Sequence, residues 1–450
     1  MADGGCIDDG DGANNQNSCP DGTFPGASFD YLAANVVKAG TDTTILPAYA
    51  IKKIKGVKIG FIGMTLKDTP SIVTASGVAG LQFRDEVATA NALVPVLKKK
   101  GVNAIVVLIH QGGVPGQQTW YHDGTPYTVN PSYDAACANG AQLDPTSPII
   151  PIAKNLDPAI DMIVSGHTHQ PYVCDIKDPA GNDRMVTSAS SFGRLYTDTT
   201  LTYDRRTQDI VRTSVSSANM LVTRDVAKDA AETGIIARYK ELVKPIASKV
   251  IGQITGDVTR TQDAAGESAL GDLIADAQLA DPSVVGSYGA PVIALMNPGG
   301  IRTDLVYDAS SWGEAPGDVT FEEAFTVQPF NNYLVSLDLT GAQARSSLLN
   351  EQWSGPNAAS RKILQVSDGF AYSYSGTTLG AVTLNGQPLD DTATYRVVTN
   401  NFLAGGGDGF PTFLDAQNVY YGGLDIDAFA DYLSAHSPYV PVALDRITAQ

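Results

Sequence analysis

The sequence predicts a two-domain protein of the α/β class. Between residues 54 and 204, short apolar runs alternate with helical stretches, and this alternation is typical of α/β units. The chain has 450 residues, which exceeds the roughly 100 to 200 residues of an ordinary domain. Hydrophobic residues make up 43% of the chain and charged residues 17%, which is the composition of a folded protein.

Apolar runs and helix-ending residues define the elements of the first domain. The runs VKIGFIGM and AIVVLI are predicted as buried strands. The helix between them ends at Gly101 after three lysines, and cations stabilise a helix C-terminus. The predicted elements are strands at 57–64, 104–109 and 162–165, helices at 85–100 and 148–156, and β-hairpin segments at 185–188, 199–204 and 209–215.

A segment of helical composition with few aromatic residues, 225–249, is predicted to be the linker between the domains. It separates a first domain at 1–224 from a second at 250–450. In the second domain an amphipathic helix is predicted at 268–278, with Ser268 as its N-cap. Strands are predicted at 292–296 and 333–339.

The charge of the chain excludes some classes of partner. Lys and Arg number 30 against 48 Asp and Glu, which gives a net charge of −18. Such a surface repels nucleic-acid polymers and anionic lipid. No apolar run is long enough to span a membrane. A phosphate ligand must therefore be held by a metal, or by a few arginines and backbone N–H groups.

The four cysteines fall into two sequence pairs. Cys6 and Cys19 bracket a polar loop, whereas Cys137 and Cys174 flank a helix-and-strand segment. We predict two disulfides, Cys6–Cys19 and Cys137–Cys174, over the two other pairings and over four reduced thiols. The residues after Met1 lack a basic start and an apolar run, so no signal peptide is expected within this sequence.

Three of the five histidines directly follow predicted strands. His110 follows AIVVLI, and His167 and His169 follow DMIVSG, so all three are expected where parallel strands end and α/β sheets build their sites. An extended segment would point the rings of His167 and His169 the same way, and Gly166 permits a sharp turn before them. Neutral imidazoles bind zinc, manganese or iron, and a pair of such metals suits phosphoryl hydrolysis. We therefore predict that these histidines are metal ligands.

The blocks VVLIHQGG and IVSGHTHQ resemble the last two motif blocks of calcineurin-like metallophosphoesterases. The blocks GESALGDLIADA, MNPGGIRTDL, TVQPFNNYL and NNFLAGGGDGF resemble, in family order, the 5′-nucleotidase / UDP-sugar hydrolase family. The resemblance implies a calcineurin-like β-sandwich with flanking helices, a linker helix and an α+β 5′-nucleotidase C-terminal domain. It also implies two divalent metals, zinc, manganese or similar, with His110 and His167 on one and His169 on the other.

Three earlier motif blocks of that family are absent from this sequence: an Asp-x-His, a Gly-Asp and a Gly-Asn-His-Asp/Glu. In the family they supply the bridging aspartate, an asparagine ligand, other ligands and the histidine that assists the leaving group. The calcineurin-like domain is therefore expected to be incomplete, and no catalytic residue is predicted. Three histidines shared between two metals leave each metal with fewer than the three or four protein ligands that a stable site needs.

The second domain carries the predicted substrate site. After the strand at 292–296, the glycines of an Asn-Pro-Gly-Gly-Ile-Arg turn let the backbone approach a ligand, and the arginine can bind an anionic oxygen. By resemblance, two phenylalanines stack on a nucleobase and an aspartate accepts hydrogen bonds from ribose. The predicted substrate-binding residues are Asn297, Gly299, Gly300, Arg302, Phe330, Asn332, Phe402 and Asp408.

The resemblance implies a secreted-type, metal-dependent phosphohydrolase of nucleoside 5′-monophosphates. Two alternatives lie in the same enzyme class, namely UDP-sugars and 2′,3′-cyclic nucleotides as substrates. An alternative from another class is a nucleotide-binding protein without catalysis, which the missing ligand blocks favour. The partner is expected to be a nucleotide or nucleoside, the state a monomer or weak dimer, and the location extracellular, periplasmic or on the cell surface.

Overall fold

The chain folds into two compact units in the computed structural model, which describes residues 5, 24–73, 75–116, 118–122, 125–129, 133–134, 136–138, 140, 143–358 and 361–450. Unit 1 comprises Met1–Thr69 and Ala79–Val226, and unit 2 comprises Pro70–Val78 and Ala227–Gln450. The predicted pairing of Cys6 with Cys19 lies outside the described residues.

Unit 1 is a mixed α/β unit, as the alternating sequence pattern predicts. Its helices are α1 (Glu86–Lys99) and α2 (Ile149–Asn155). Its strands are β1 (Val36–Lys38), β2 (Tyr49–Ile54), β3 (Val57–Thr65), β4 (Leu81–Phe83), β5 (Ala104–His110), β6 (Gln118–His122), β7 (Thr125–Val129), β8 (Ala136–Ala138), β9 (Met162–Val164), β10 (Pro171–Lys177), β11 (Asp183–Ala189), β12 (Leu195–Thr200), β13 (Tyr203–Asp204), β14 (Asp209–Ile210) and β15 (Ser216–Leu221).

A seven-stranded mixed sheet of order β2-β3-β5-β9-β11-β10-β8 is the centre of unit 1. Strands β3, β5, β9 and β11 run parallel to one another, and β2 and β10 are antiparallel to their neighbours β3 and β11. Because β5 and β9 are parallel neighbours, the loops after them begin at the same edge of the sheet. That edge carries the predicted metal ligands.

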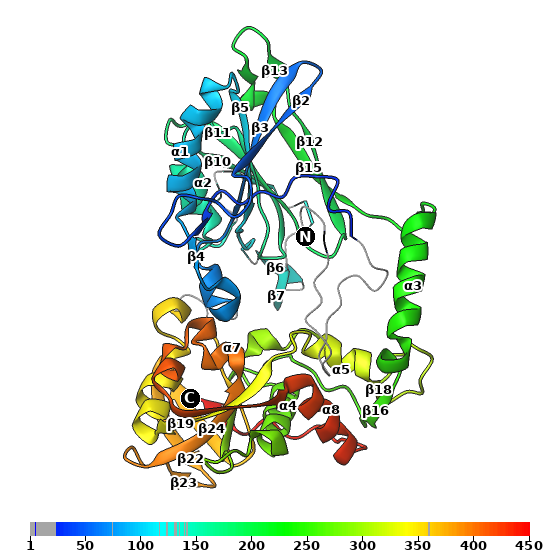
Figure 1. Cartoon of the computed structure of the whole chain (residues 1–450), viewed down its shortest axis with the longest axis vertical. Helices are drawn as coiled ribbons and strands as arrows, with labels where there is room; N and C mark the ends of the chain where they lie inside the picture. Colours follow the sequence, from blue (N-terminus) through cyan, green and yellow to red (C-terminus); the bar gives the residue numbers. More distant parts are fainter. Residues whose placement is uncertain are drawn as a thin grey trace. The chain divides into compact units, whose positions relative to one another are not determined.

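Apolar layers cover both faces of this sheet. Helices α1 and α2 pack over one face, against side chains that include Ile62, Val107 and Ile163. The ribbon formed by β12 and β15 contacts β10 and β11 on the other face, which contains Val106 and Met162. Figure 1 shows the two helices on one side of the sheet and the ribbon on the other. The sheet is therefore a buried and rigid support for the loops at its edge.

The predicted helix at 85–100 is confirmed, because capping defines both of its ends. The carboxylate of Asp85 accepts a hydrogen bond from the backbone N–H of Ala88 at 2.8 Å, and Lys100 is the C-cap. The predicted hairpin of 199–204 with 209–215 is only partly correct. Residues 203–204 do pair with 209–210, but β12 pairs with β15. The second segment is broken because Arg212 bonds to the buried carboxylate of Asp178 at 2.7 Å, and residues 212–214 form a 3₁₀ turn.

Asp161 connects the starts of β5 and β9 from a buried position. Its side chain is 2% exposed, and one carboxylate oxygen accepts a hydrogen bond from the backbone N–H of Ile105 at 2.9 Å. Burial raises the pKa of Asp161 to about 7, although Arg212 and Arg184 partly oppose this shift. The carboxyl group is therefore protonated in the folded chain under conditions where it is ionised in the unfolded chain.

We expect this residue to make the stability of unit 1 fall as the pH rises. Between the unfolded pKa near 4 and the folded pKa of about 7, the folded state binds one more proton than the unfolded state. The contribution of protonated Asp161 to the free energy of unfolding is complete below pH 4 and lost above pH 7. The free energy of unfolding should change by on the order of 2 to 4 kcal/mol between these limits. Asp161→Asn, which stays neutral, should flatten this dependence and stabilise unit 1 at pH 8.

Urea unfolding of the chain at pH 4.5 and pH 8 measures this effect. Asp198→Asn is the matched control, because Asp198 is exposed on β12. If Asp161→Asn and Asp198→Asn change the pH dependence equally, burial of Asp161 does not control it.

Unit 2 is also a mixed α/β unit. Its helices are α3 (Ala230–Ala247), α4 (Ala269–Ala280), α5 (Phe321–Val327), α6 (Leu349–Glu351), α7 (Asn401–Ala404) and α8 (Asp425–Ala435). Its strands are β16 (Val250–Gln253), β17 (Ile293–Met296), β18 (Asp318–Thr320), β19 (Tyr333–Thr340), β20 (Gln365–Val366), β21 (Phe370–Ser375), β22 (Thr378–Leu384), β23 (Gln387–Pro388), β24 (Thr394–Asn400), β25 (Gln417–Leu424) and β26 (Ile447–Ala449).

A five-stranded sheet of order β20-β17-β24-β19-β25 is the centre of unit 2. Helix α4 packs against β17 and α8 on one face, where Met296 and Phe429 are buried. On the other face, Leu295 of β17 and Phe370 of β21 belong to a second apolar cluster. The predicted N-cap of α4 is confirmed, since the hydroxyl of Ser268 accepts a hydrogen bond from the N–H of Gly271.

Candidate functional site

Two of the predicted metal ligands in unit 1 lie close together. His110 is the last residue of β5, and His167 lies in the loop after the neighbouring parallel strand β9. The centroids of their rings are 5.2 Å apart in an edge-to-face arrangement. The third predicted ligand, His169, instead contacts Phe192, with ring centroids 5.5 Å apart. The sheet thus brings His110 and His167 together, and His169 lies beside a different loop.

Close backbone packing holds the two histidine loops against each other. A side-chain carbon added to Gly112 would lie 2.2 Å from the carbonyl oxygen of Gly166, so only glycine fits there. The hydroxyl of Thr168 donates to the carbonyl of Gly113 at 2.7 Å. The loop after β5 and the loop after β9 therefore act as one packed element.

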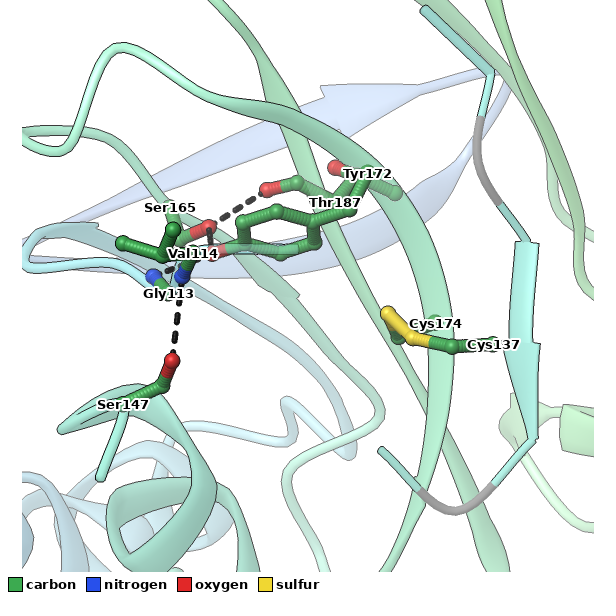
Figure 2. Close-up of a disulfide and its surroundings, with 8 residues drawn as sticks. All are labelled: Gly113, Val114, Cys137, Ser147, Ser165, Tyr172, Cys174 and Thr187. Atoms are coloured by element: carbon green, nitrogen blue, oxygen red, sulfur yellow. Dashed lines mark hydrogen bonds between the residues drawn. A yellow bond between two sulfur atoms is a disulfide. The ribbon is translucent and has the colours of Figure 1, made fainter. Parts of the chain in front are cut away.

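A buried tyrosine joins the same two loops. The phenolic oxygen of Tyr172 accepts a hydrogen bond from the N–H of Gly113 at 3.1 Å and lies 2.6 Å from the hydroxyl of Ser165, and Figure 2 shows both contacts. Ser165 also donates to the carbonyl of Thr187 in β11. Tyr172 is fully buried, and this burial raises its pKa, so the phenol stays protonated.

The conformation of the second histidine loop differs from the extended segment predicted from the sequence. His167 has φ 71° and His169 has φ 59°, so both lie in the left-handed region, which non-glycine residues rarely adopt. Gly166, in contrast, does not have a positive φ. The carbonyl of His169 is held by the hydroxyl of Ser190 at 3.0 Å, which helps to fix this conformation. Such backbone strain is found preferentially at functional sites.

Burial lowers the pKa of His167, and the neighbouring His110 and His169 lower it further. The folded chain therefore favours the neutral imidazole of His167, whose ring nitrogen can bind a metal. The spacing of His110 and His167 fits two imidazoles that share one divalent ion. Within the part of the chain that the structure describes, however, no group of three or more His, Cys, Asp or Glu side chains is arranged to hold a metal. The described residues thus supply a pair of donors, fewer than the usual three or four.

In unit 2, chain topology brings all the predicted substrate-binding residues to one edge of the sheet. Strands β17 and β24 are parallel, so the residues at their ends, Asn297 and Asn400, lie side by side. Strand β19 runs antiparallel to β24, with Leu334 opposite Asn400. The residues just before β19, which include Phe330 and Asn332, therefore lie at this edge as well.

Asp408 is the most constrained residue of this edge. It is 9% exposed and has φ 57°, a left-handed conformation that Asp tolerates better than most residues. One carboxylate oxygen accepts from the side-chain amide of Asn297 at 2.7 Å, and the other lies 2.5 Å from the ammonium group of Lys362. Asn357 donates to the Asp408 carbonyl at 2.9 Å. Each carboxylate oxygen can still accept a further hydrogen bond from a ligand.

The glycine turn brings an arginine and a phenylalanine next to this carboxylate. A side-chain carbon on Gly299 would lie 3.3 Å from Asp408 Oδ2, and one on Gly300 would lie 2.4 Å from the methyl group of Met296. Arg302 is exposed, donates to the carbonyl of Gly299 at 3.1 Å, and lies with its guanidinium carbon 5.8 Å from the ring centroid of Phe330. A positive charge and an aromatic face, which is half exposed, thus lie close to Asp408.

The second predicted aromatic residue, Phe402, lies in the short helix α7. The side chain of Asn400 caps this helix by accepting from the N–H of Leu403 at 2.9 Å, and its amide donates to the carbonyl oxygen of the Asn297 side chain at 3.1 Å. Phe402 is half buried, and its ring lies directly against Gly407, where a side-chain carbon would come within 2.6 Å of it. The ring is therefore partly packed in the core and partly accessible.

Asn332 has a partner within the protein. Its side-chain amide donates to the carboxylate of Asp425 at 3.2 Å. Burial raises the pKa of Asp425 to about 7, and the bond from Asn332 partly opposes this shift. The side-chain amides of Asn332 and Asn297 both donate hydrogen bonds to buried aspartates. Their predicted contacts to a ligand stay predictions.

Four residues that the sequence interpretation missed position the two sites, namely Tyr172, Asn357, Lys362 and Asn400. Tyr172 follows His169 by three residues, at the start of a buried strand. A buried aromatic residue with a hydroxyl group at that place indicates a side chain that can bond to the neighbouring loops. Lys362 and Asn357 reach Asp408 from more than 40 positions away along the chain. No local motif indicates such distant partners.

The predicted pairing of Cys137 with Cys174 is present as a disulfide. The two residues are direct partners in the parallel pairing of β8 and β10, and Figure 2 shows the bond close to Tyr172. No helix in the described part of the chain has the length and apolar character needed to cross a membrane.

Comparison with protein families agrees with this geometry. Residues 250–415, which contain all eight predicted substrate-binding residues, match the family "5′-nucleotidase, C-terminal domain". The chain is 33% identical over 423 residues to the cell wall protein Lmo0130 of Listeria monocytogenes, with 89% of this chain and 50% of the relative covered. The chain thus spans about half the length of that curated relative.

Two further proteins are similar over a larger share of their length. A 5′-nucleotidase of Vibrio cholerae is 25% identical over 448 residues, with 92% of this chain and 73% of that protein covered. The crystal structure of a 5′-nucleotidase precursor from Thermus thermophilus superposes with a TM-score of 0.72 at 26% identity, covering 94% of this chain and 78% of the other. The predicted architecture of a calcineurin-like unit followed by a C-terminal α+β unit is confirmed by this likeness.

Proposed function

We propose that the chain, whose residues 250–415 match the 5′-nucleotidase C-terminal domain, is a phosphohydrolase that releases phosphate from nucleoside 5′-monophosphates. The observation that carries this proposal is the environment of Asp408. A buried carboxylate, held from two sides by Asn297 and Lys362, faces the glycine turn that also carries Arg302. This combination of groups suits a ligand that has both hydroxyl groups and an anionic group.

The proposed nucleotide contacts follow from the chemistry of each side chain. Asp408 accepts hydrogen bonds from the ribose hydroxyls, because its carboxylate oxygens have acceptor capacity left. Phe330 and Phe402 stack on the two faces of the base. Arg302 donates to phosphate oxygens in a bidentate manner. Because the net charge of the chain is −18, such local cations are needed to hold an anionic ligand.

A divalent metal, when bound, supplies a Lewis acid and a water of lowered pKa. His110 and His167 are the proposed ligands of one ion, and His169 of a second. Because the described histidines offer two donors to one ion and one donor to the other, we expect the 450-residue chain to retain fewer than two tightly held metal ions. We further propose an extracellular or cell-surface location, which the disulfide and the relative described as a cell wall protein support.

The test combines metal analysis after dialysis with chromatographic analysis of the products formed from AMP, UDP-glucose and 2′,3′-cyclic AMP in the presence of zinc or manganese. Hydrolysis that is fastest for AMP, with adenosine and phosphate as products, is the expected result. Faster hydrolysis of one of the other substrates would reassign the specificity. Tight AMP binding without hydrolysis of any substrate would overturn the proposal in favour of a nucleotide-binding protein without catalysis. Two tightly held ions per chain would overturn the expected metal content.

Replacing Phe402 by alanine is expected to weaken adenosine binding by roughly 1 to 3 kcal/mol, because the base loses a stacking partner. Isothermal titration of adenosine measures the change. Tyr421→Ala is a matched control, since Tyr421 is a 62% exposed aromatic residue of the same sheet. Unchanged affinity in a folded Phe402→Ala variant would assign this ring to the core alone.

A further inference from the structure

The loop between β11 and β12 lies next to the histidine loop of unit 1 and has an unusual conformation. Ser190 and Phe192 have φ angles of 61°, and Gly193 has φ 64°. A left-handed conformation is a rare outlier for a bulky aromatic residue. The loop is bonded to the histidine loop, because the hydroxyl of Ser190 donates to the carbonyl of His169 at 3.0 Å.

This strained conformation points an aromatic ring into solvent. The side chain of Phe192 is 79% exposed, the highest value among the large hydrophobic side chains of the described residues. The ring forms an edge-to-face pair with His169, with the centroids 5.5 Å apart. Packing does not explain the strain, because so exposed a ring gains little from burial. Strain that burial does not offset is a feature of functional loops.

An arginine lies over the same ring. The guanidinium carbon of Arg194 is 5.2 Å from the centroid of Phe192, a distance at which a cation is attracted to the ring face. The backbone of Arg194 is fixed by the bond from the N–H of Val222 to its carbonyl at 2.9 Å. Arg194 forms no salt bridge with any described residue, and its side chain is exposed, so its N–H donors can reach a ligand.

We propose that Arg194, held over Phe192 beside His169, binds the phosphate group of the substrate in unit 1. The guanidinium of Arg194 lies over the ring that also contacts His169, and this ring limits the freedom of the guanidinium before the ligand arrives. A planar guanidinium with several donors matches the oxygens of a phosphate group. The inference rests on the proposed function for the identity of the ligand, but the binding step needs no metal.

The test is a titration of inorganic phosphate into the full chain in the presence of EDTA. All chains in this titration carry Arg302→Gln, because the arginine of unit 2 would also bind phosphate. Arg194→Gln in this background is expected to weaken phosphate binding at least fivefold. Arg205→Gln is the matched control, because Arg205 is an exposed arginine in the turn between β13 and β14 of the same unit. Equal affinities of the Arg194→Gln and Arg205→Gln chains would overturn the proposal.

A second variant separates binding from stability. Phe192→Gly removes the ring and also relieves the left-handed strain, since glycine adopts φ 61° freely. We expect Tm to stay constant or rise by about 2 to 4 °C while phosphate affinity falls at least twofold. A purely structural loop would show the opposite, with a lower Tm and unchanged affinity. If Arg194→Gln loses phosphate binding and the unaltered chain hydrolyses no nucleotide, the phosphate site at Arg194 is supported. The proposed function fails in that case.

Discussion

Asp408→Asn is expected to weaken AMP and adenosine binding about a hundredfold, the largest effect of any single change in unit 2. Hydrogen bonds to a charged group contribute about 1.5 to 3 kcal/mol, and the neutral amide would lose this contribution from the proposed bonds to the ribose hydroxyls. It also leaves the ammonium group of Lys362 beside an uncharged partner, where a 2.5 Å ion pair existed. Asn has nearly the shape of Asp and tolerates φ 57°, so the variant should fold.

Isothermal titration with AMP and with adenosine measures this effect. Asp415→Asn provides the control, because Asp415 is an exposed aspartate in the same segment of the chain. Equal losses for AMP and adenosine are expected, since the proposed contact of Asp408 is to the ribose and not to the phosphate. A loss confined to AMP would instead mean that the Asp408–Lys362 pair acts on the phosphate. Unchanged binding of both ligands would remove Asp408 from the site.

Gly112→Ala is expected to lower the free energy of unfolding of unit 1 by about 3 kcal/mol, because overpacking against rigid neighbours is costly. The added methyl group would lie 2.2 Å from the carbonyl oxygen of Gly166 and 2.7 Å from the hydroxyl of Thr168. A backbone atom cannot move aside as a flexible side chain does. The loop after β9 must therefore shift as a whole, and His167 shifts away from His110.

Gly166→Ala is an unusually close control for this experiment. A methyl group on Gly166 would lie 3.6 Å from the ring nitrogen Nδ1 of His110, which is an ordinary contact, and Gly166 does not have a positive φ. We expect the Gly166 variant to lose less than about 1 kcal/mol. Urea unfolding measures the stabilities, and NMR signals of the histidine rings report the movement. Equal stabilities of the two variants would contradict the packing described for these loops.

The contrast between these two glycines illustrates what the sequence could predict. His110 and His167 were placed correctly at the ends of strands, because apolar runs identify strands and parallel strands end at one edge. Gly166 was expected to form the sharp turn, since glycine adopts a positive φ most easily. The positive φ belongs to His167 and His169 instead. The bond from Ser190 to His169 contributes to this outcome, and a contact between residues 21 positions apart has no local signature.

The same distinction holds in unit 2. The start of α4 was predicted within a residue or two, because capping residues act locally. The gathering of Asn297, Phe330 and Asp408 at one edge was expected from a family resemblance and not from spacing. Lys362 lies 46 positions from Asp408, and only the folded chain brings the two together. Local chemistry therefore predicts elements, whereas the site depends on contacts between distant segments.

The disulfide between Cys137 and Cys174 has a consequence for how the sheet of unit 1 meets other chains. It attaches β8, a strand of only three residues, to the outer side of β10, a strand of seven. A covered edge cannot recruit a strand from another molecule, whereas an open edge of seven residues offers a template for aggregation. The disulfide thus adds a covalent link to the parallel pairing that holds β8 over part of the edge of β10.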